Sequence, residues 1–225
     1  MKKIVFLVSG GGGTLIFINE ALKLLNLPFT IVGVIGDREC YALTYAKNSG
    51  IFSRKIKYTK ENNSELKDRL LQLEPDIVIT NFHKIIGEEI INLSQIKFLN
   101  LHYSLLPSFA GLIGMKTIEV AKAKNSKFIG TTVHYVDEIV DNGKIIGQTC
   151  ISVNWENSIL IEDTIFKSGC LNLLNAILIE EKTERKKQYN SVKLNNYEVM
   201  FSPEIIFKTT EINNDFWEKI KTLII

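Results

Sequence analysis

In the first hundred residues, short continuous apolar runs alternate with stretches in which apolar residues recur every three or four positions. Continuous runs are typical of buried strands, and the longer spacing is typical of amphipathic helices. The runs predict strands at residues 4–8, 29–35, 56–58, 76–80 and 98–101. The spacing predicts helices at residues 14–25, 41–48, 63–73 and 85–93. This alternation predicts an α/β fold with a Rossmann-like, mostly parallel twisted sheet and helices on both faces.

The pattern changes after Pro107, where a helix is expected at residues 115–124. Two extended segments at 129–136 and 145–153 flank a polar loop, which predicts an antiparallel strand pair joined by that loop. A long helix is expected at 159–181 and a last helical piece at 216–225, with polar, irregular chain between them. We therefore expect one main domain over residues 1–182 and a short C-terminal appendage over residues 183–225.

Composition excludes several classes of protein. The chain has 27 basic and 25 acidic residues, a net charge of +2 that gives no ground for nucleic-acid binding. No apolar stretch approaches the ~20 residues of a membrane span, and the apolar start is too short for a signal peptide. The three cysteines are isolated, which favours a reducing compartment over a disulfide framework or a zinc site. We expect a cytoplasmic protein with no metal, nucleic-acid or membrane partner.

Asn100 and His102 form the most informative motif. In an extended strand alternate side chains share a face, so these two project together while Leu101 points into the core. Pro107 follows soon after and ends the strand. The pair of an amide donor and a titratable base therefore sits where strand becomes loop, which is where open α/β sheets bind ligands.

A glycine-rich turn follows the first predicted strand. Glycines let backbone N–H groups approach an anion, and the start of a helix adds a favourable dipole. The turn therefore predicts a phosphate site formed by Gly11, Gly12, Gly13 and Thr14. No Lys-Ser/Thr pair follows, so this is not a Walker A loop.

A dinucleotide site is an alternative for the same turn, because Gly10 and Gly12 match the first two glycines of the fingerprint. Asp37 ends the second strand where a ribose-binding acid would lie, although Leu15 takes the third glycine position. A nicotinamide-dinucleotide-binding reductase therefore stays open as a second class of function. A third interpretation is that the turn binds no ligand and uses glycine only because a side chain would not fit there.

Three segments together carry a resemblance to a known family: residues 8–10 (Val-Ser-Gly), residues 100–107 (Asn-Leu-His-Tyr-Ser-Leu-Leu-Pro) and residues 132–143 (Thr-Val-His-Tyr-Val-Asp-Glu-Ile-Val-Asp-Asn-Gly). Together they resemble the folate-dependent formyltransferases, nearest to the phosphoribosylglycinamide branch, over about residues 1–155. In that family an Asn and a His of the N-x-H-x-S-L-L-P segment and an Asp of a D-x-G loop form the catalytic trio. The resemblance places that trio at Asn100, His102 and Asp141.

The resemblance implies transfer of the formyl group of 10-formyltetrahydrofolate to the amine of a small phosphorylated acceptor, glycinamide ribonucleotide in purine synthesis. Residues 1–182 would be the formyltransferase catalytic domain. The resemblance also implies a folate site, lined by Phe82, His83, Lys84, Ile85, Ile86, Val136, Glu138 and Val140.

The chemistry of the trio supports the same roles. When an amine attacks a formyl carbonyl, an oxyanion develops that Asn100 can stabilise as a donor. A carboxylate such as Asp141 favours the charged form of His102, which could then carry a proton to the departing folate nitrogen, while a water links Asp141 to the amine. His134 lies inside an alternating strand and is expected to be structural, and a zinc site of His102, His134 and Asp141 lacks local ligand spacing.

The chain departs from the family in its late helix, where members carry a Glu-His pair that contacts substrate. Residues 166–171 read Phe-Lys-Ser-Gly-Cys-Leu, without the glutamate, and Lys167 is expected to be a solvated helix lysine. An amino-sugar nucleotide is therefore an alternative acceptor, and a non-catalytic folate- or nucleotide-binding protein is a further alternative. The exact amine, the role of the tail and the oligomeric state, a homodimer included, stay open.

Overall fold

The computed structural model describes residues 1–180 and 189–224. By contacts the chain forms two compact units: the first contains residues 1–100 and the last segment from Thr210, and the second contains Leu101–Thr209. The functional boundary expected at residue 182, between a catalytic domain and an appendage, stays a prediction.

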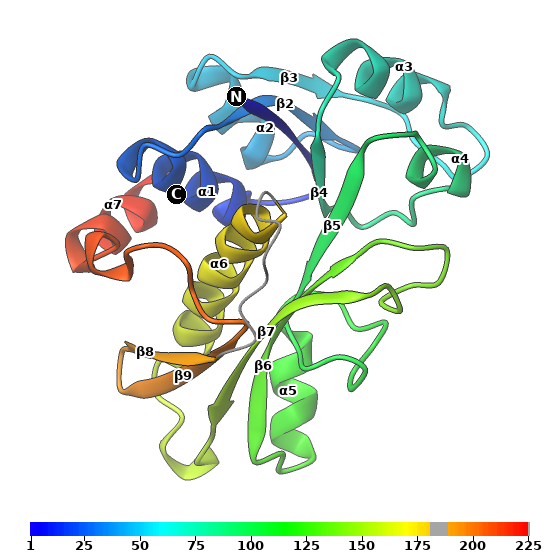
Figure 1. The fold of residues 1–225 in the computed structure, drawn as a ribbon. Helices are drawn as coiled ribbons and strands as arrows, with labels where there is room; N and C mark the ends of the chain where they lie inside the picture. Colours follow the sequence, from blue (N-terminus) through cyan, green and yellow to red (C-terminus); the bar gives the residue numbers. More distant parts are fainter. Residues whose placement is uncertain (181–188, 225) are drawn as a thin grey trace. The chain divides into compact units, whose positions relative to one another are not determined.

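The first unit contains a parallel sheet (Figure 1). Its strands are β1 (Lys2–Val8), β2 (Phe29–Gly36), β3 (Phe52–Lys55), β4 (Ile77–Asn81) and β5 (Lys97–His102), in the order β3-β2-β1-β4-β5. Its connecting helices are α1 (Gly13–Leu24), α2 (Tyr41–Asn48), α3 (Ser64–Leu73) and α4 (Glu88–Ile91). Ile4 at the centre pairs with Ile31 on one side and Ile77 on the other. The α/β class and the parallel order are confirmed.

Helix α7 (Asn214–Leu223) brings the end of the chain onto α1, as the red and blue helices of Figure 1 show. The Trp217 ring stacks on Phe17 with centroids 5.0 Å apart, and Phe216 meets Phe17 edge-on at 5.8 Å. Phe17 is fully buried, so this aromatic cluster removes a large apolar area from water. The last helix is therefore part of the first unit's core.

Glu20 on α1 is a buried carboxylate held by partners from both helices. Lys219 Nζ lies 2.6 Å from its Oε2, and Lys23 Nζ lies 2.8 Å from its Oε1. Burial alone would raise the pKa of Glu20, but hydrogen bonds from Lys219 and Lys23 outweigh it and lower the pKa. A lowered carboxyl pKa stabilises the fold above the usual value of 4.5, and that stability is lost as the pH falls through the lowered pKa.

We expect Lys219→Gln to reduce the free energy of unfolding by about 1 kcal/mol at pH 7, since Lys219 is partly exposed and Lys23 remains. Urea unfolding of parent and variant at descending pH should show this difference shrinking as the pH falls through the lowered pKa of Glu20, because Glu20 then becomes neutral in both. Lys221→Gln, on the same helix but paired with the exposed Glu218, is the matched control. A difference that did not depend on pH would contradict the assignment.

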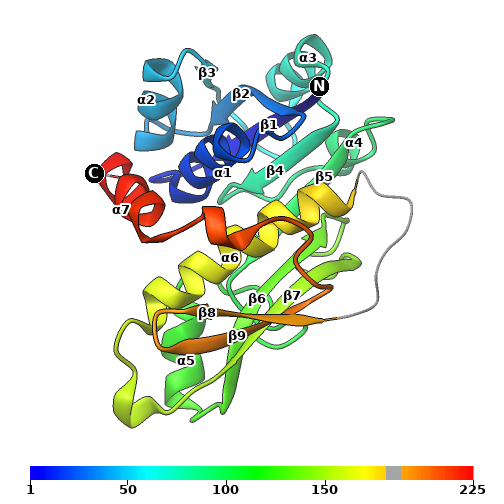
Figure 2. The ribbon, with the colours of Figure 1, turned by 60° about the vertical axis from the view of Figure 1, so that its left-hand side comes forward.

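The second unit contains an antiparallel sheet of β6 (Phe128–Tyr135), β7 (Ile145–Ser152), β9 (Tyr197–Ser202) and β8 (Asn190–Leu194), in that order. The expected strand pair is confirmed, with Thr131 opposite Thr149. Helix α6 (Ile161–Ile179) packs against all four strands (Figure 2), and α5 (Lys116–Ala123) precedes β6. Two short 3₁₀ helices lie at Trp155–Asn157 and Thr209–Glu211.

Several predicted elements were wrong in place or length. The third strand lies at β3 rather than at residues 56–58, and the helix expected at 85–93 is reduced to Glu88–Ile91. Strands β8 and β9 lie in chain expected to be irregular, because pairing with β7 and with each other stabilises segments that alternate buried and exposed residues. The predicted helix over 159–181 begins only at Ile161, and its last expected residue falls outside the described chain.

Among the described residues, every helix is too short or too polar to cross a membrane.

Candidate functional site

Strand β5 carries both Asn100 and His102, two residues apart, with the buried Leu101 between them. His102 is 5% exposed, which makes it a buried polar residue at the end of the strand. In the first unit the Thr80 hydroxyl lies 3.3 Å from Asn100 Oδ1 and 3.1 Å from the Leu99 carbonyl oxygen. Because a hydroxyl donates to Oδ1, this contact orients the Asn100 amide group. Sequence reasoning did not single out Thr80.

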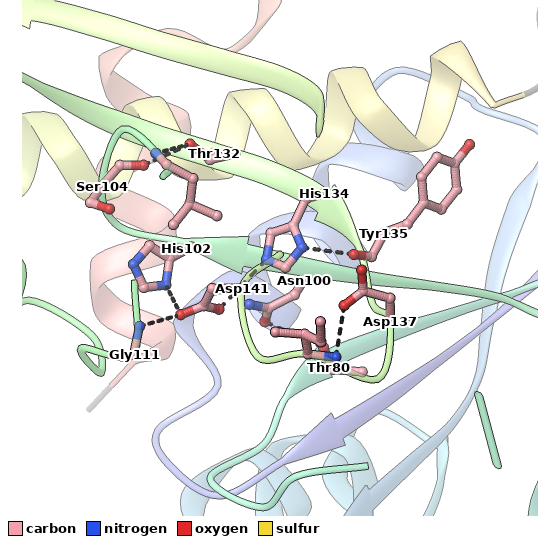
Figure 3. A network of polar contacts seen from close by, with 12 residues as sticks. Thr80, Asn100, His102, Ser104, Gly111, Thr132, His134, Tyr135, Asp137 and Asp141 are labelled. Carbon is pink, nitrogen blue, oxygen red and sulfur yellow. Dashed lines mark hydrogen bonds and ion pairs between the residues drawn. The ribbon is translucent and has the colours of Figure 1, made fainter. Parts of the chain in front are cut away.

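Asp141 lies between the rings of two histidines in the second unit (Figure 3). Its Oδ2 is 3.4 Å from His102 Nδ1, and its Oδ1 is 3.7 Å from His134 Nε2. The side chains of all three are at least nine-tenths buried. The structure therefore brings Asp141 next to His102, and it adds His134, which was expected to be structural only.

Each histidine also faces a backbone carbonyl with its other ring nitrogen. His102 Nε2 is 3.3 Å from the Phe109 oxygen, and His134 Nδ1 is 2.7 Å from the Tyr135 oxygen. A carbonyl only accepts, so each of these nitrogens carries a hydrogen. The nitrogen that faces Asp141 then carries a hydrogen only when its ring is charged. When the His102 ring is charged, its Nδ1–H can therefore donate to Asp141 Oδ2.

The surroundings of His134 favour its neutral form. Burial lowers the pKa of His134, although the Tyr135 carbonyl and Asp141 both favour its charged form. His134 was expected to be structural because it lies within an alternating strand in the sequence. Only the fold reveals that it faces a carboxylate.

The loop that carries Asp141 is pinned at both ends. The Asp137 carboxylate accepts from Ile139 N at 3.0 Å and from Asn142 Nδ2 at 3.3 Å. Gly143 is required at its position, since a Cβ there would lie 1.8 Å from the Tyr135 carbonyl oxygen. Asp141 itself has a φ of 58°, and its Oδ2 accepts from Gly111 N at 2.7 Å. These contacts fix the direction of the carboxylate.

The segment after His102 is also held by β6, as Figure 3 shows. The Thr132 hydroxyl donates to the Ser104 carbonyl at 2.7 Å and accepts from Leu106 N at 3.0 Å. Both bonds are buried, so they are worth more than the same bonds in water. They position the backbone that immediately follows His102.

The glycine-rich turn lies in the first unit, between β1 and α1. Gly12 caps α1 with a φ of 76°, and a Cβ on it would lie 2.7 Å from Ala42 Cβ. Gly11 is exposed, and nothing lies within 4 Å of the place where its Cβ would be. The Thr14 side chain is buried, so an anion at this turn would meet backbone N–H groups rather than the Thr14 hydroxyl.

The segment expected to line the folate site follows β4. Ile85 is 59% exposed, whereas Ile86 is buried. The Ser9 hydroxyl accepts from His83 N at 2.8 Å, and the Phe82 ring lies 5.5 Å from that of Tyr58. In the second unit Ile139 and Val140 are 65% and 50% exposed, and Glu138 and the half-buried Val136 lie on the same loop.

The late-helix stretch 166–171 lies on α6. A Cβ on Gly169 would be 3.0 Å from a Tyr103 ring atom and 3.3 Å from Leu101, so a larger residue would have to displace Tyr103. The prediction of a solvated Lys167 is wrong: it is 7% exposed, and its Nζ lies 2.7 Å from Asp163 Oδ2. Lys167 is therefore occupied by an internal ion pair.

No group of three or more His, Cys, Asp or Glu side chains is placed to hold a metal ion among the residues with described positions.

Comparison with known proteins identifies the family of this chain. A family model described as formyl transferase matches residues 2–164. A phosphoribosylglycinamide formyltransferase from Haemophilus influenzae is 36% identical over 166 residues, which cover 71% of this chain and 77% of that protein. A chloroplastic phosphoribosylglycinamide formyltransferase from Vigna unguiculata is 35% identical over 161 residues, or 68% of this chain, and the match spans about half (52%) of its length.

Solved structures agree with the sequence matches. The phosphoribosylglycinamide formyltransferase of Bacillus halodurans superposes with a TM-score of 0.72 at 27% identity, covering 82% of this chain and 98% of that one. The family match covers most of the chain and includes β5 and the Asp141 loop. This chain belongs to the formyl transferase family.

Proposed function

We propose that this protein transfers the formyl group of 10-formyltetrahydrofolate to the amine of a small phosphorylated acceptor, glycinamide ribonucleotide. The observation that carries the proposal is the contact between buried His102 and Asp141, because His102 lies on the strand that also carries Asn100. The names of the relatives support the same acceptor.

In the proposed reaction each residue of the trio, Asn100, His102 and Asp141, has one role. The Asn100 amide donates to the formyl oxygen as negative charge develops there, and charged His102 assists it. The attacking amine loses a proton to the Asp141 carboxylate through a water molecule. His102 delivers its own proton to the folate nitrogen as the bond between that nitrogen and the formyl carbon breaks.

The residues present fit 10-formyltetrahydrofolate, which supplies the formyl group when bound. Flat heteroaromatic groups bind against apolar side chains with backbone polar groups at their edges. Ile85 in the first unit and Ile139 and Val140 in the second expose such side chains on loops. These loops are the two segments in which the resemblance to the family implies folate contacts.

The acceptor's phosphate would bind at the turn before α1, where N–H groups of the first helical turn have no partner within the helix. Gly11 tests this role best, because a side chain there meets no protein atom within 4 Å. Gly12 is a poor test, since a side chain there would strain a left-handed residue and press on Ala42.

We expect Gly11→Val to raise the acceptor KM by about tenfold while the folate KM changes less than about twofold, because the side chain blocks only the anion's approach. Steady-state kinetics with each substrate varied in turn measure both constants, and the thermal unfolding midpoint serves as the folding control. A rise in the folate KM alone would mean that the turn serves the other ligand.

A panel of amine acceptors tests the proposal directly, with release of tetrahydrofolate as the signal. Glycinamide ribonucleotide should be the best acceptor. An amino-sugar nucleotide belongs in the panel because residues 166–171 on α6 lack the glutamate that the resemblance leads us to expect in this stretch. Absence of transfer to every amine, together with saturable binding of a nicotinamide dinucleotide, would replace the proposal with the reductase alternative.

A further inference from the structure

Two parallel strands of the first unit, β4 and β5, separate just before Asn100. The last pair in their register joins Ile79 to Leu99. Strand β4 continues to pair with β1 on its other side through Thr80 and Asn81. Thr80 and Asn100 therefore come next on the two strands, at the point where β4 and β5 diverge. Such a divergence at the carboxyl ends of parallel strands is where α/β sheets bind ligands.

The hydroxyl of Thr80 bridges the two strands at this point. Thr80 is buried, and its Oγ1 lies 3.1 Å from the Leu99 carbonyl oxygen and 3.3 Å from Asn100 Oδ1. A hydroxyl carries a single hydrogen, so the two acceptors share it. In this buried position the bond is stronger than the same bond in water. The Thr80 hydroxyl thus takes over where the backbone pairing ends, and it holds Asn100 Oδ1 toward β4.

The orientation of the Asn100 amide decides what this residue can do. The oxygen and the nitrogen of an asparagine amide have nearly the same shape, so hydrogen-bond partners determine which of them faces which way. With Oδ1 held by Thr80, Nδ2 projects along the other branch of the planar group. Nδ2 is the donor that the proposed mechanism directs at the formyl oxygen. A reversed amide would present Oδ1 instead, and its negative end would repel the developing oxyanion.

We propose that Thr80 is a positioning residue for formyl transfer, whose hydroxyl keeps the Asn100 amide turned with Nδ2 toward the reacting carbonyl. The inference rests on the proposed function and adds to it a residue that acts only through Asn100. Its effect belongs to the transition state, where the oxyanion forms, and not to the binding of either substrate. One neutral hydrogen bond, shared between two acceptors, corresponds to about a fivefold change in rate.

The test is a double-mutant cycle on the single-turnover rate of formyl transfer, measured with the full chain in excess over 10-formyltetrahydrofolate. Thr80→Val removes the hydroxyl and keeps the shape, so the rate should fall about fivefold while both steady-state KM values change less than about twofold. Thr80→Ser keeps the hydroxyl and should stay within about twofold of the parent. In an Asn100→Ala background, Thr80→Val should cause no further loss, because the amide that Thr80 positions is gone.

Thr164→Val is the matched control. Thr164 is also buried, and its hydroxyl donates to the Leu160 carbonyl at 2.8 Å, but it lies on α6 in the second unit. This variant should lower the thermal unfolding midpoint and leave the transfer rate within about twofold of the parent. Thr80→Ala, which removes the hydroxyl without adding an apolar group in its place, takes the position of Thr80→Val in the cycle if the valine variant does not fold.

A parental rate in Thr80→Val would overturn the inference and leave the proposed function intact. An equal fold loss with and without the Asn100 amide would do the same, because Thr80 would then act through the strand and not through Asn100. A loss in Thr80→Ser as large as that in Thr80→Val would show that the hydroxyl is not the group that matters. A parent chain that transfers no formyl group to any amine would instead remove the proposed function, and the inference with it.

Discussion

Asp141→Asn is expected to lower kcat by at least about 10²-fold, with little change in either KM. In the proposed mechanism, the variant loses the group that accepts the amine's proton and the charge that stabilises protonated His102. The fold should survive, because asparagine tolerates the left-handed backbone of residue 141, and its amide oxygen can still accept from Gly111 N. Steady-state kinetics and the thermal unfolding midpoint measure the two effects.

Asp68→Asn is the matched control, since Asp68 is an exposed carboxylate on α3, away from β5 and the 137–143 loop in the sequence. It should leave kcat within about twofold of the parent, as surface changes usually do. Near-normal turnover of Asp141→Asn would remove Asp141 from the mechanism.

His102→Gln is expected to lower kcat at neutral pH by about 10²-fold or more, because glutamine can donate a hydrogen bond but cannot carry a proton. The pH profile gives a second, independent readout. In the parent, loss of the His102 proton should depress kcat on the alkaline side. That alkaline limb should be absent from the residual activity of His102→Gln.

The same profile tests the coupling of the pair. A carboxylate stabilises the charged ring, so removing its charge in Asp141→Asn makes the ring lose its proton more readily, and the alkaline limb should move to lower pH. We would measure kcat against pH for the parent and both variants. An unmoved limb in Asp141→Asn would mean that the 3.4 Å contact does not govern the proton of His102.

Local pattern was sufficient where short-range chemistry decides structure. The apolar run of β1, the glycines and the spacing of α1 predicted strand, turn and helix in place, and α2 was predicted with its observed bounds. Pattern failed for β3, β8 and β9. β3 and β8 are short and largely polar, and β9 is short and lies in a polar part of the chain, so pairing with neighbours rather than their own sequence makes these strands extended.

In the candidate site, too, some features follow from local sequence and others only from the tertiary structure. The sequence by itself determined that Asn100 and His102 share one strand and that a glycine turn precedes α1, because both depend on residues adjacent in the chain. Only the tertiary structure decided that Asp141 lies between His102 and His134. The same holds for the Thr80 contact that orients Asn100 and for the ion pair of Lys167 with Asp163. Each of these contacts joins residues on different elements, or one turn apart on a buried helix face. Their distances follow from packing and loop geometry, which no local periodicity encodes.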